Sequence, residues 1–159
     1  GRRRRGARGR FPEGGRRKRV AIGALLVSAG ALLVARGNAA RLDLGARAEF
    51  RAGDWATGVE GVFDLLLINP PYIGVDEPLS GDVLREPANA LFAGADGLDD
   101  YRRIAPDLPR LIAPGGMAAI EIGHRQGDSV GALVAAQGLS VAIRHDLAGL
   151  DRCVIATRT

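Results

Sequence analysis

The sequence predicts an open α/β sheet, in which strands alternate with helices and the sheet does not close into a barrel. Two observations support this prediction: apolar runs of strand length alternate with segments of helical periodicity, and the last two runs are separated only by the four residues LAGL. Alternating strands and helices favour a mostly parallel sheet, and two successive strands predict an antiparallel hairpin at its edge. The 159 residues suffice for one domain with a hydrophobic core.

The positive charge of the chain is concentrated at its start. Residues 1 to 19 contain ten of the 22 basic residues and one of the 18 acidic residues, so the remainder has 12 basic against 17 acidic residues, a net charge of −5. The opening lacks apolar periodicity, and we expect residues 1–19 to form a disordered basic tail. Such a tail can bind nucleic acid, but a solvated tail without a function is the more common case. The single cysteine, Cys153, suits a reducing compartment and indicates a cytoplasmic protein.

The uncharged run VAIGALLVSAGALLVA, residues 20–35, allows two interpretations. It resembles a signal peptide or a short membrane anchor, but it falls short of the roughly 20 apolar residues of a spanning helix and lacks a good cleavage site. We therefore favour a strand over 19–27 and a helix from Ala31 to Leu42, with Ser28 as a possible cap. The side chains expected to face the sheet are Leu32, Leu33, Ala35, Ala39 and Leu42.

The other elements follow from hydrophobic pattern and from turn residues. The segment 46–55 predicts a strand that ends at a turn, and the continuous apolar run 61–69 is typical of a strand buried on both faces of a parallel sheet. Proline, glycine and aspartate predict a long loop over 70–98. A helix follows from Leu98 to Ile112, and Pro106 and Pro109 interrupt it. The remaining expectations are a strand over 117–123, a helix over 127–138 and two strands over 139–146 and 150–159.

The stretch NPPY, residues 69–72, ends the apolar run 61–69. In an open α/β sheet, ligands bind outside the carboxyl ends of the strands, so position makes Asn69 a candidate site residue. Pro70 and Pro71 have a fixed φ and no N–H donor, which leaves carbonyl acceptors on a rigid segment. An ordinary strand exit with a turn-forming Asn-Pro step explains the same four residues equally well.

A carbonyl and the side-chain oxygen of Asn69 can together accept both hydrogens of a planar nitrogen, and the ring of Tyr72 can stack on that group. Such a nitrogen is a poor nucleophile because its lone pair is shared. Accepting its hydrogens orients it and stabilises the positive charge that develops during attack.

Four stretches resemble the glutamine amide methyltransferases that modify peptide chain release factors. They are NPPY, REPANALFAGADGLDDYRRI at 85–104, LIAPGGMAAIEIGHRQG at 111–127 and HDLAGLDRCVIATR at 145–158. With 38–74, the likeness covers about three quarters of the chain. The resemblance implies a Rossmann-like class I methyltransferase sheet, and residues 20–159 would form a partial catalytic domain of this kind.

The resemblance also implies a reaction and a site. Asn69, Pro70, Pro71 and Tyr72 would hold the glutamine of a release factor's Gly-Gly-Gln loop, and S-adenosyl-L-methionine would donate a methyl group to its amide nitrogen. Asn69 would also contact the cofactor. Asp54 and Trp55 match the family's acidic-aromatic pair, which would bind the adenine by a hydrogen bond and by stacking. The residues alone would also fit a turn at Asp54 and a buried anchor at Trp55. The expected partner is a release factor. We expect the protein to be monomeric and not to associate with membranes.

The chain departs from the family upstream of residue 28. The glycine-rich turn that would hold the methionine end of the cofactor has no counterpart, the acid expected to bind the ribose falls on Leu26, and the family's helical front domain is missing. These departures suggest a truncated or frame-shifted reading, with the first strand and the glycine-rich loop missing or altered. Two alternatives stay open: methylation of an adenine or guanine amine in nucleic acid, which the acidic body disfavours, and a catalytically inactive fragment that lacks cofactor binding. His124 and His145 are isolated, so we expect no metal site.

Overall fold

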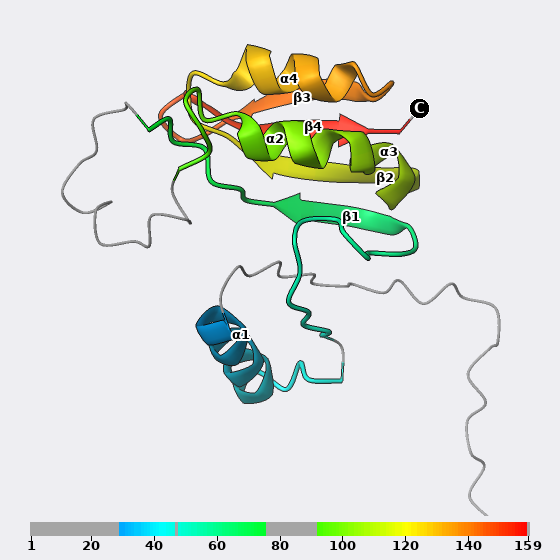
Figure 1. Ribbon diagram of the computed structural model, residues 1–159. Coiled ribbons are helices and arrows are strands. Elements are labelled where there is room, and N and C mark those ends of the chain that lie inside the picture. Colours follow the sequence, from blue (N-terminus) through cyan, green and yellow to red (C-terminus); the bar gives the residue numbers. More distant parts are fainter. Residues whose placement is uncertain (1–28, 47, 76–91, 159) are drawn as a thin grey trace, which may run out of the picture.

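A computed structural model describes residues 29–46, 48–75 and 92–158 of the chain (Figure 1). Its helical elements are α1 (Ala29–Arg41), α2 (Asp99–Ile104), the 3-10 helix η3 (Ala105–Asp107), α3 (Leu108–Leu111) and α4 (Gly127–Ala135). Its strands are β1 (Phe63–Ile68), β2 (Ile112–Glu121), β3 (Ser140–His145) and β4 (Asp151–Thr157). The expected tail, the strand over 19–27, the cap at Ser28 and most of the loop over 70–98 lie outside the described residues.

The four described strands form one open sheet in the order β1-β2-β4-β3. β1 and β2 are parallel, whereas β4 is antiparallel to both β2 and β3. Three of the four strands therefore run in the same direction, and β3 and β4 form the predicted hairpin at the edge. The carboxyl ends of β1 and β2 lie at the same edge of the sheet, which is where the chain leaves β1 at Asn69.

The hydrophobic core lies between one face of this sheet and the helices α2 to α4 (Figure 1). Ala118, Ile120 and Ile122 alternate along β2 and its exit, and each is at most 1% exposed. Tyr101 of α2 and Val130 of α4 are buried against them. Fully burying an aliphatic side chain stabilises a fold by about 1.5–3 kcal/mol, so this layer holds β2 against α2 and α4.

The interrupted helix behaves as its prolines predict. Pro106 and Pro109 each lie at the start of a new helical piece, so the expected single helix becomes α2, η3 and α3 in succession. The helix over 127–138 is also confirmed, and it ends before Gly138, whose φ is +78°.

Three expectations were wrong. The segment 48–55 is not a strand, because alternation of side chains makes a strand only where the backbone finds a neighbouring strand to pair with. The face opposite the helices is not buried in the described part of the chain: Leu65, Leu67 and Met117 are 50%, 75% and 41% exposed.

In α1, only one narrow stripe is covered. Leu32 and Ala39 lie seven positions apart on the same side of the helix and are buried, whereas Leu33 and Leu42 are exposed. Leu32 and Ala39 do not belong to the core between the sheet and the helices α2 to α4, and Figure 1 shows α1 apart from the sheet. The prediction that this helix packs on the sheet through five side chains was therefore wrong. None of the helices that the structure describes is both long and apolar enough to cross a membrane.

Candidate functional site

Asn69 is the first residue after β1, at the carboxyl edge of the sheet. Its side chain is exposed, and it has no hydrogen-bond partner among the described residues. The next residue, Pro70, is less than 2% exposed and fastens the segment to the body of the protein. The free carboxamide of Asn69 thus leaves a backbone that the buried Pro70 anchors.

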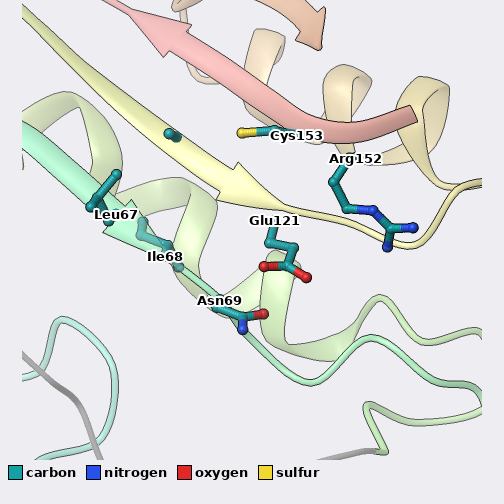
Figure 2. Close-up of a pocket in the computed structure, with 7 residues that line it drawn as sticks. Leu67, Ile68, Asn69, Glu121, Arg152 and Cys153 are labelled. Carbon is teal, nitrogen blue, oxygen red and sulfur yellow. The ribbon is translucent and has the colours of Figure 1, made fainter. Parts of the chain in front are cut away.

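A cavity of about 240 Å³ opens beside Asn69. It is lined by residues of three neighbouring strands and their exits, namely Leu67, Ile68, Asn69, Ala119, Glu121, Arg152 and Cys153. Figure 2 shows Asn69 and Glu121 projecting from the ends of adjacent strands, with Arg152 beyond them on β4. The cavity therefore has an apolar floor on the strands and polar groups at its rim.

Some polar side chains at the rim are hydrogen-bonded to other residues of the chain, and others are not. The carboxylate of Glu121 has no hydrogen bond or ion pair with any described residue. The Arg152 guanidinium donates to Asp146 Oδ2 at 3.2 Å and to the Ile122 carbonyl at 3.4 Å. Burial raises the pKa of the Cys153 thiol, so this thiol stays protonated. Asn69 and Glu121 are thus the side chains at this rim that are free to bind a ligand.

The end of β2, which presents Glu121, is fixed from the helical side. The Tyr101 hydroxyl donates a hydrogen bond to the Glu121 carbonyl oxygen at 2.8 Å. Burial raises the pKa of this phenol above its ordinary value of 10.0, so the hydroxyl remains a donor. The free carboxylate of Glu121 therefore extends from a backbone position that α2 holds in place.

Tyr72 is half-buried and packs against the hydrophobic core instead of lining the cavity. Its carbonyl oxygen accepts a hydrogen bond from Gln126 Nε2 at 2.9 Å. Asn69 therefore lies at the cavity side of the four-residue segment, and Tyr72 lies at its anchored end.

Asp54 and Trp55 lie against α2, and neither lines the cavity. The Asp54 carboxylate pairs with the Arg103 guanidinium, and the Trp55 indole N–H donates to Asp100 Oδ1 at 2.8 Å. Trp55 has a φ of +48° and packs against the core. The structure thus brings Asp54 and Trp55 together with α2, and it brings Asn69 together with Glu121.

These residues fit S-adenosylmethionine in part. At the transfer end, the free amide of Asn69 borders a cavity. Arg103 engages the carboxylate of Asp54 in this structure, so Asp54 would have to exchange that partner before it could accept from an adenine amino group. No described group of three or more His, Cys, Asp or Glu side chains could hold a metal ion.

Sequence reasoning missed the contributions of Arg152 and Cys153 to the cavity and of Gln126 to the Tyr72 segment. The register between β2 and β4 decides the first two, because it pairs Cys153 with Glu121. No local sequence signal reports that register. For Gln126 there is a weak sequence signal: a glutamine three residues after Gly123, at the start of a helix, can bond back to the Gly123 N–H.

Comparison with known proteins gives a consistent result, although no family model matches the chain. The release factor glutamine methyltransferase of Rhodospirillum rubrum is 45% identical over 136 residues, covering 83% of this chain and 42% of the relative. That of Cereibacter sphaeroides is 48% identical over 134 residues, covering 82% and 48%. The chain spans about half the length of the curated relatives it matches.

A solved structure identifies the fold. The crystal structure of ribosomal protein L11 methylase from Lactobacillus delbrueckii subsp. bulgaricus matches with a TM-score of 0.60 at 13% identity, over 84% of this chain and 56% of that chain. The open sheet with its edge hairpin is therefore a class I methyltransferase fold.

Proposed function

Because this chain is a homologue of the release factor glutamine methyltransferases, we propose that it transfers a methyl group from S-adenosylmethionine to the side-chain amide nitrogen of a glutamine. The substrate we propose is the Gly-Gly-Gln loop of a peptide chain release factor. The observation that supports this most directly is the free carboxamide of Asn69, held on a buried proline at the rim of a cavity.

The proposed roles of the residues follow from their hydrogen-bonding capacity. The side-chain oxygen of Asn69 and a carbonyl of the following segment accept the two hydrogens of the substrate amide. This fixes the nitrogen and stabilises its positive charge as the bond to the methyl carbon forms. S-adenosylmethionine, when bound, would supply that carbon on its sulfonium sulfur, which leaves as a neutral thioether when the carbon–sulfur bond breaks, and the methylated nitrogen would then lose one proton to water.

The adenine end of the cofactor is assigned to Asp54 and Trp55. A carboxylate accepts from the adenine amino group and the indole covers one face of the ring. The acidic charge of residues 20–159, a net −5, supports a protein substrate over nucleic acid, since a nucleic-acid track needs clustered basic side chains. A reducing, cytoplasmic location agrees with the single cysteine and with a release factor as partner.

The test is transfer of a radiolabelled methyl group to a release factor by the wild-type chain, Asn69→Ala and Asn38→Ala. Asn38 is an exposed asparagine of α1 that serves as the control. Loss of one preorganised group at the reacting centre typically costs about 10²–10³-fold in rate. We expect a loss of that size for Asn69→Ala and none for Asn38→Ala. Because the Asn69 side chain is exposed, both variants should keep the thermal stability of the wild type.

The other outcomes distinguish the alternatives. Equal labelling by both variants would remove Asn69 from the reaction. Labelling of a single-stranded oligonucleotide instead of the release factor would indicate a nucleic-acid amine as substrate. No labelling at all, together with no heat on calorimetric titration with S-adenosylmethionine, would identify a catalytically inactive homologue.

A further inference from the structure

Gln126 lies between β2 and α4, and it joins three parts of the chain. A tight turn precedes it, in which its own N–H donates to the Gly123 carbonyl at 2.9 Å. The side chain then folds back, and its Oε1 accepts from the Gly123 N–H at 2.9 Å. Gln126 is thus first fixed to the end of β2, next to Glu121.

The other end of the carboxamide reaches two distant segments. Its Nε2 donates to the Tyr72 carbonyl at 2.9 Å and to the Gly97 carbonyl at 3.3 Å. These contacts span 54 and 29 residues of sequence. One planar group therefore connects the exit of β2, the segment after β1 and the turn before α2.

The three segments are packed closely at this point. Gly97 has a φ of +71°, and a Cβ added to it would lie 2.3 Å from the Tyr72 carbonyl oxygen and 2.8 Å from Gln126 Nε2. A Cβ on Gly123 would lie 3.0 Å from Gln126 Oε1. The glycines permit this approach, and the contacts leave the carboxamide little freedom to rotate.

A fixed Tyr72 carbonyl constrains Asn69. Only Pro70 and Pro71 separate the two residues, and each proline locks its own φ. Fixing the segment at Tyr72 therefore restricts the directions in which the Asn69 carboxamide can leave it.

We propose that Gln126 is a positioning residue that sets the Asn69 carboxamide at the reacting geometry by holding the Tyr72 carbonyl. This rests on the proposed methyl transfer and deepens it. A displacement of about 1 Å at a reacting group can cost about 100-fold in rate. The loss of Gln126 should therefore appear in the chemical step and leave substrate binding largely unchanged.

Two variants test the role. Gln126→Glu keeps the acceptor for the Gly123 N–H but places a carboxylate oxygen against two carbonyls. Gln126→Met keeps the length of the side chain and removes every polar contact without adding charge. Gln137, near the other end of α4, has no hydrogen bond through its side chain to a described residue and supplies the controls Gln137→Glu and Gln137→Met.

We expect both Gln126 variants to lower kcat for methyl transfer by about 10–100-fold while KM for the release factor changes by less than about twofold. Both Gln137 controls should retain wild-type kcat. A carboxylate at the start of α4 favours that helix, so a general loss of helix stability would not explain the Gln126→Glu result. Unchanged kcat in Gln126→Met, or a rise in KM alone, would overturn the positioning role.

Hydrogen exchange gives a readout that does not depend on activity. The Ala93 N–H donates to Ile73 O and the Val75 N–H to Gly94 O, each across the segment that Gln126 holds. We expect both amides to exchange faster in the Gln126 variants and not in the controls. If the wild type transfers no methyl group, the proposed reaction fails. The exchange result is independent of that outcome. Unchanged exchange of the Ala93 and Val75 amides would show that Gln126 does not hold the segment after β1, and faster exchange would support the structural part of the inference.

Discussion

Asp54 and Trp55 are neighbours in sequence, and α2 holds each of them by a different side chain. Asp54 and Arg103 are 65% and 51% exposed in their side chains, so their ion pair contributes less than about 1 kcal/mol to stability. Trp55 adds a hydrogen bond to Asp100 and contacts with the core. The contacts of Trp55 therefore hold both residues in place beside α2, and the Asp54 carboxylate can change partners at little cost in stability.

This difference allows a test of the role proposed for Asp54. We expect Asp54→Asn to weaken S-adenosylmethionine binding about tenfold, which corresponds to one hydrogen bond to a charged group. The control, Arg103→Gln, removes the same ion pair but leaves the carboxylate, so binding should be kept or strengthened. Calorimetric titration measures both. Equal weakening in the two variants would show that only the ion pair matters.

At the scale of elements, the connection between β3 and β4 depends on Asp146. Its Oδ1 accepts from the backbone N–H groups of Ala148 and Leu150, and its Oδ2 accepts from Arg152. The N–H of Leu150, followed by Arg152 and Ala148, lowers the pKa of this carboxyl group below 3.8. The ionised carboxylate therefore stabilises the hairpin that carries Arg152 and Cys153 to the cavity.

The sign of the pH dependence follows from that direction. Because the folded pKa is depressed, the stabilisation is complete above the unfolded pKa of about 3.9 and is lost as the pH falls through the lower folded value. We expect Asp146→Asn to unfold at a lower temperature than the wild type near neutral pH. The difference should shrink below about pH 4. Thermal unfolding of both chains across this range is the measurement, and a difference independent of pH would contradict the assignment.

Sequence patterns predicted the elements whose causes are local. Pro106 and Pro109 break the helix wherever it packs, and a continuous apolar run makes β1. They failed for the described residues 48–55 of the expected strand, where the outcome depends on a neighbouring strand that the sequence pattern does not locate.

The candidate site divides in the same way. Asn69 was predicted as a site residue because it ends a strand, a feature that the local sequence indicates, and its role stays a prediction. The place of Arg152 at the cavity depends on strand register, and the contact of Gln126 with Tyr72 joins distant parts of the chain, so local sequence reports neither. Whether Asp54 and Trp55 bind the cofactor remains a prediction.

At the scale of the whole molecule, the two faces of the sheet differ in how much stability they supply. Helices cover one face, and the other exposes Leu65, Leu67 and Met117 among the described residues. Burial against helices, and not the apolar character of a strand as such, therefore decides which side chains stabilise this fold.

Matched substitutions measure this asymmetry. Leu67 is 75% exposed on β1, whereas Leu108 is 1% exposed on α3. We expect Leu108→Ala to cost about 2–5 kcal/mol in the free energy of unfolding and Leu67→Ala less than about 0.5 kcal/mol. Denaturant unfolding compares the two. A large loss for Leu67→Ala would mean that its face is covered in solution.

The bond from the Tyr101 phenol to the last carbonyl of β2 and the hydrogen bonds of the Asp146 carboxylate respond to opposite ends of the pH scale. A phenol that resists ionisation keeps the Glu121 side of the rim attached to α2 in basic solution, whereas acid loosens the β3–β4 connection that bears Arg152. The Glu121 side of the cavity therefore depends on a protonated Tyr101, and the Arg152 side depends on an ionised Asp146. Between the acidic and the alkaline extremes, both sides keep their hydrogen bonds.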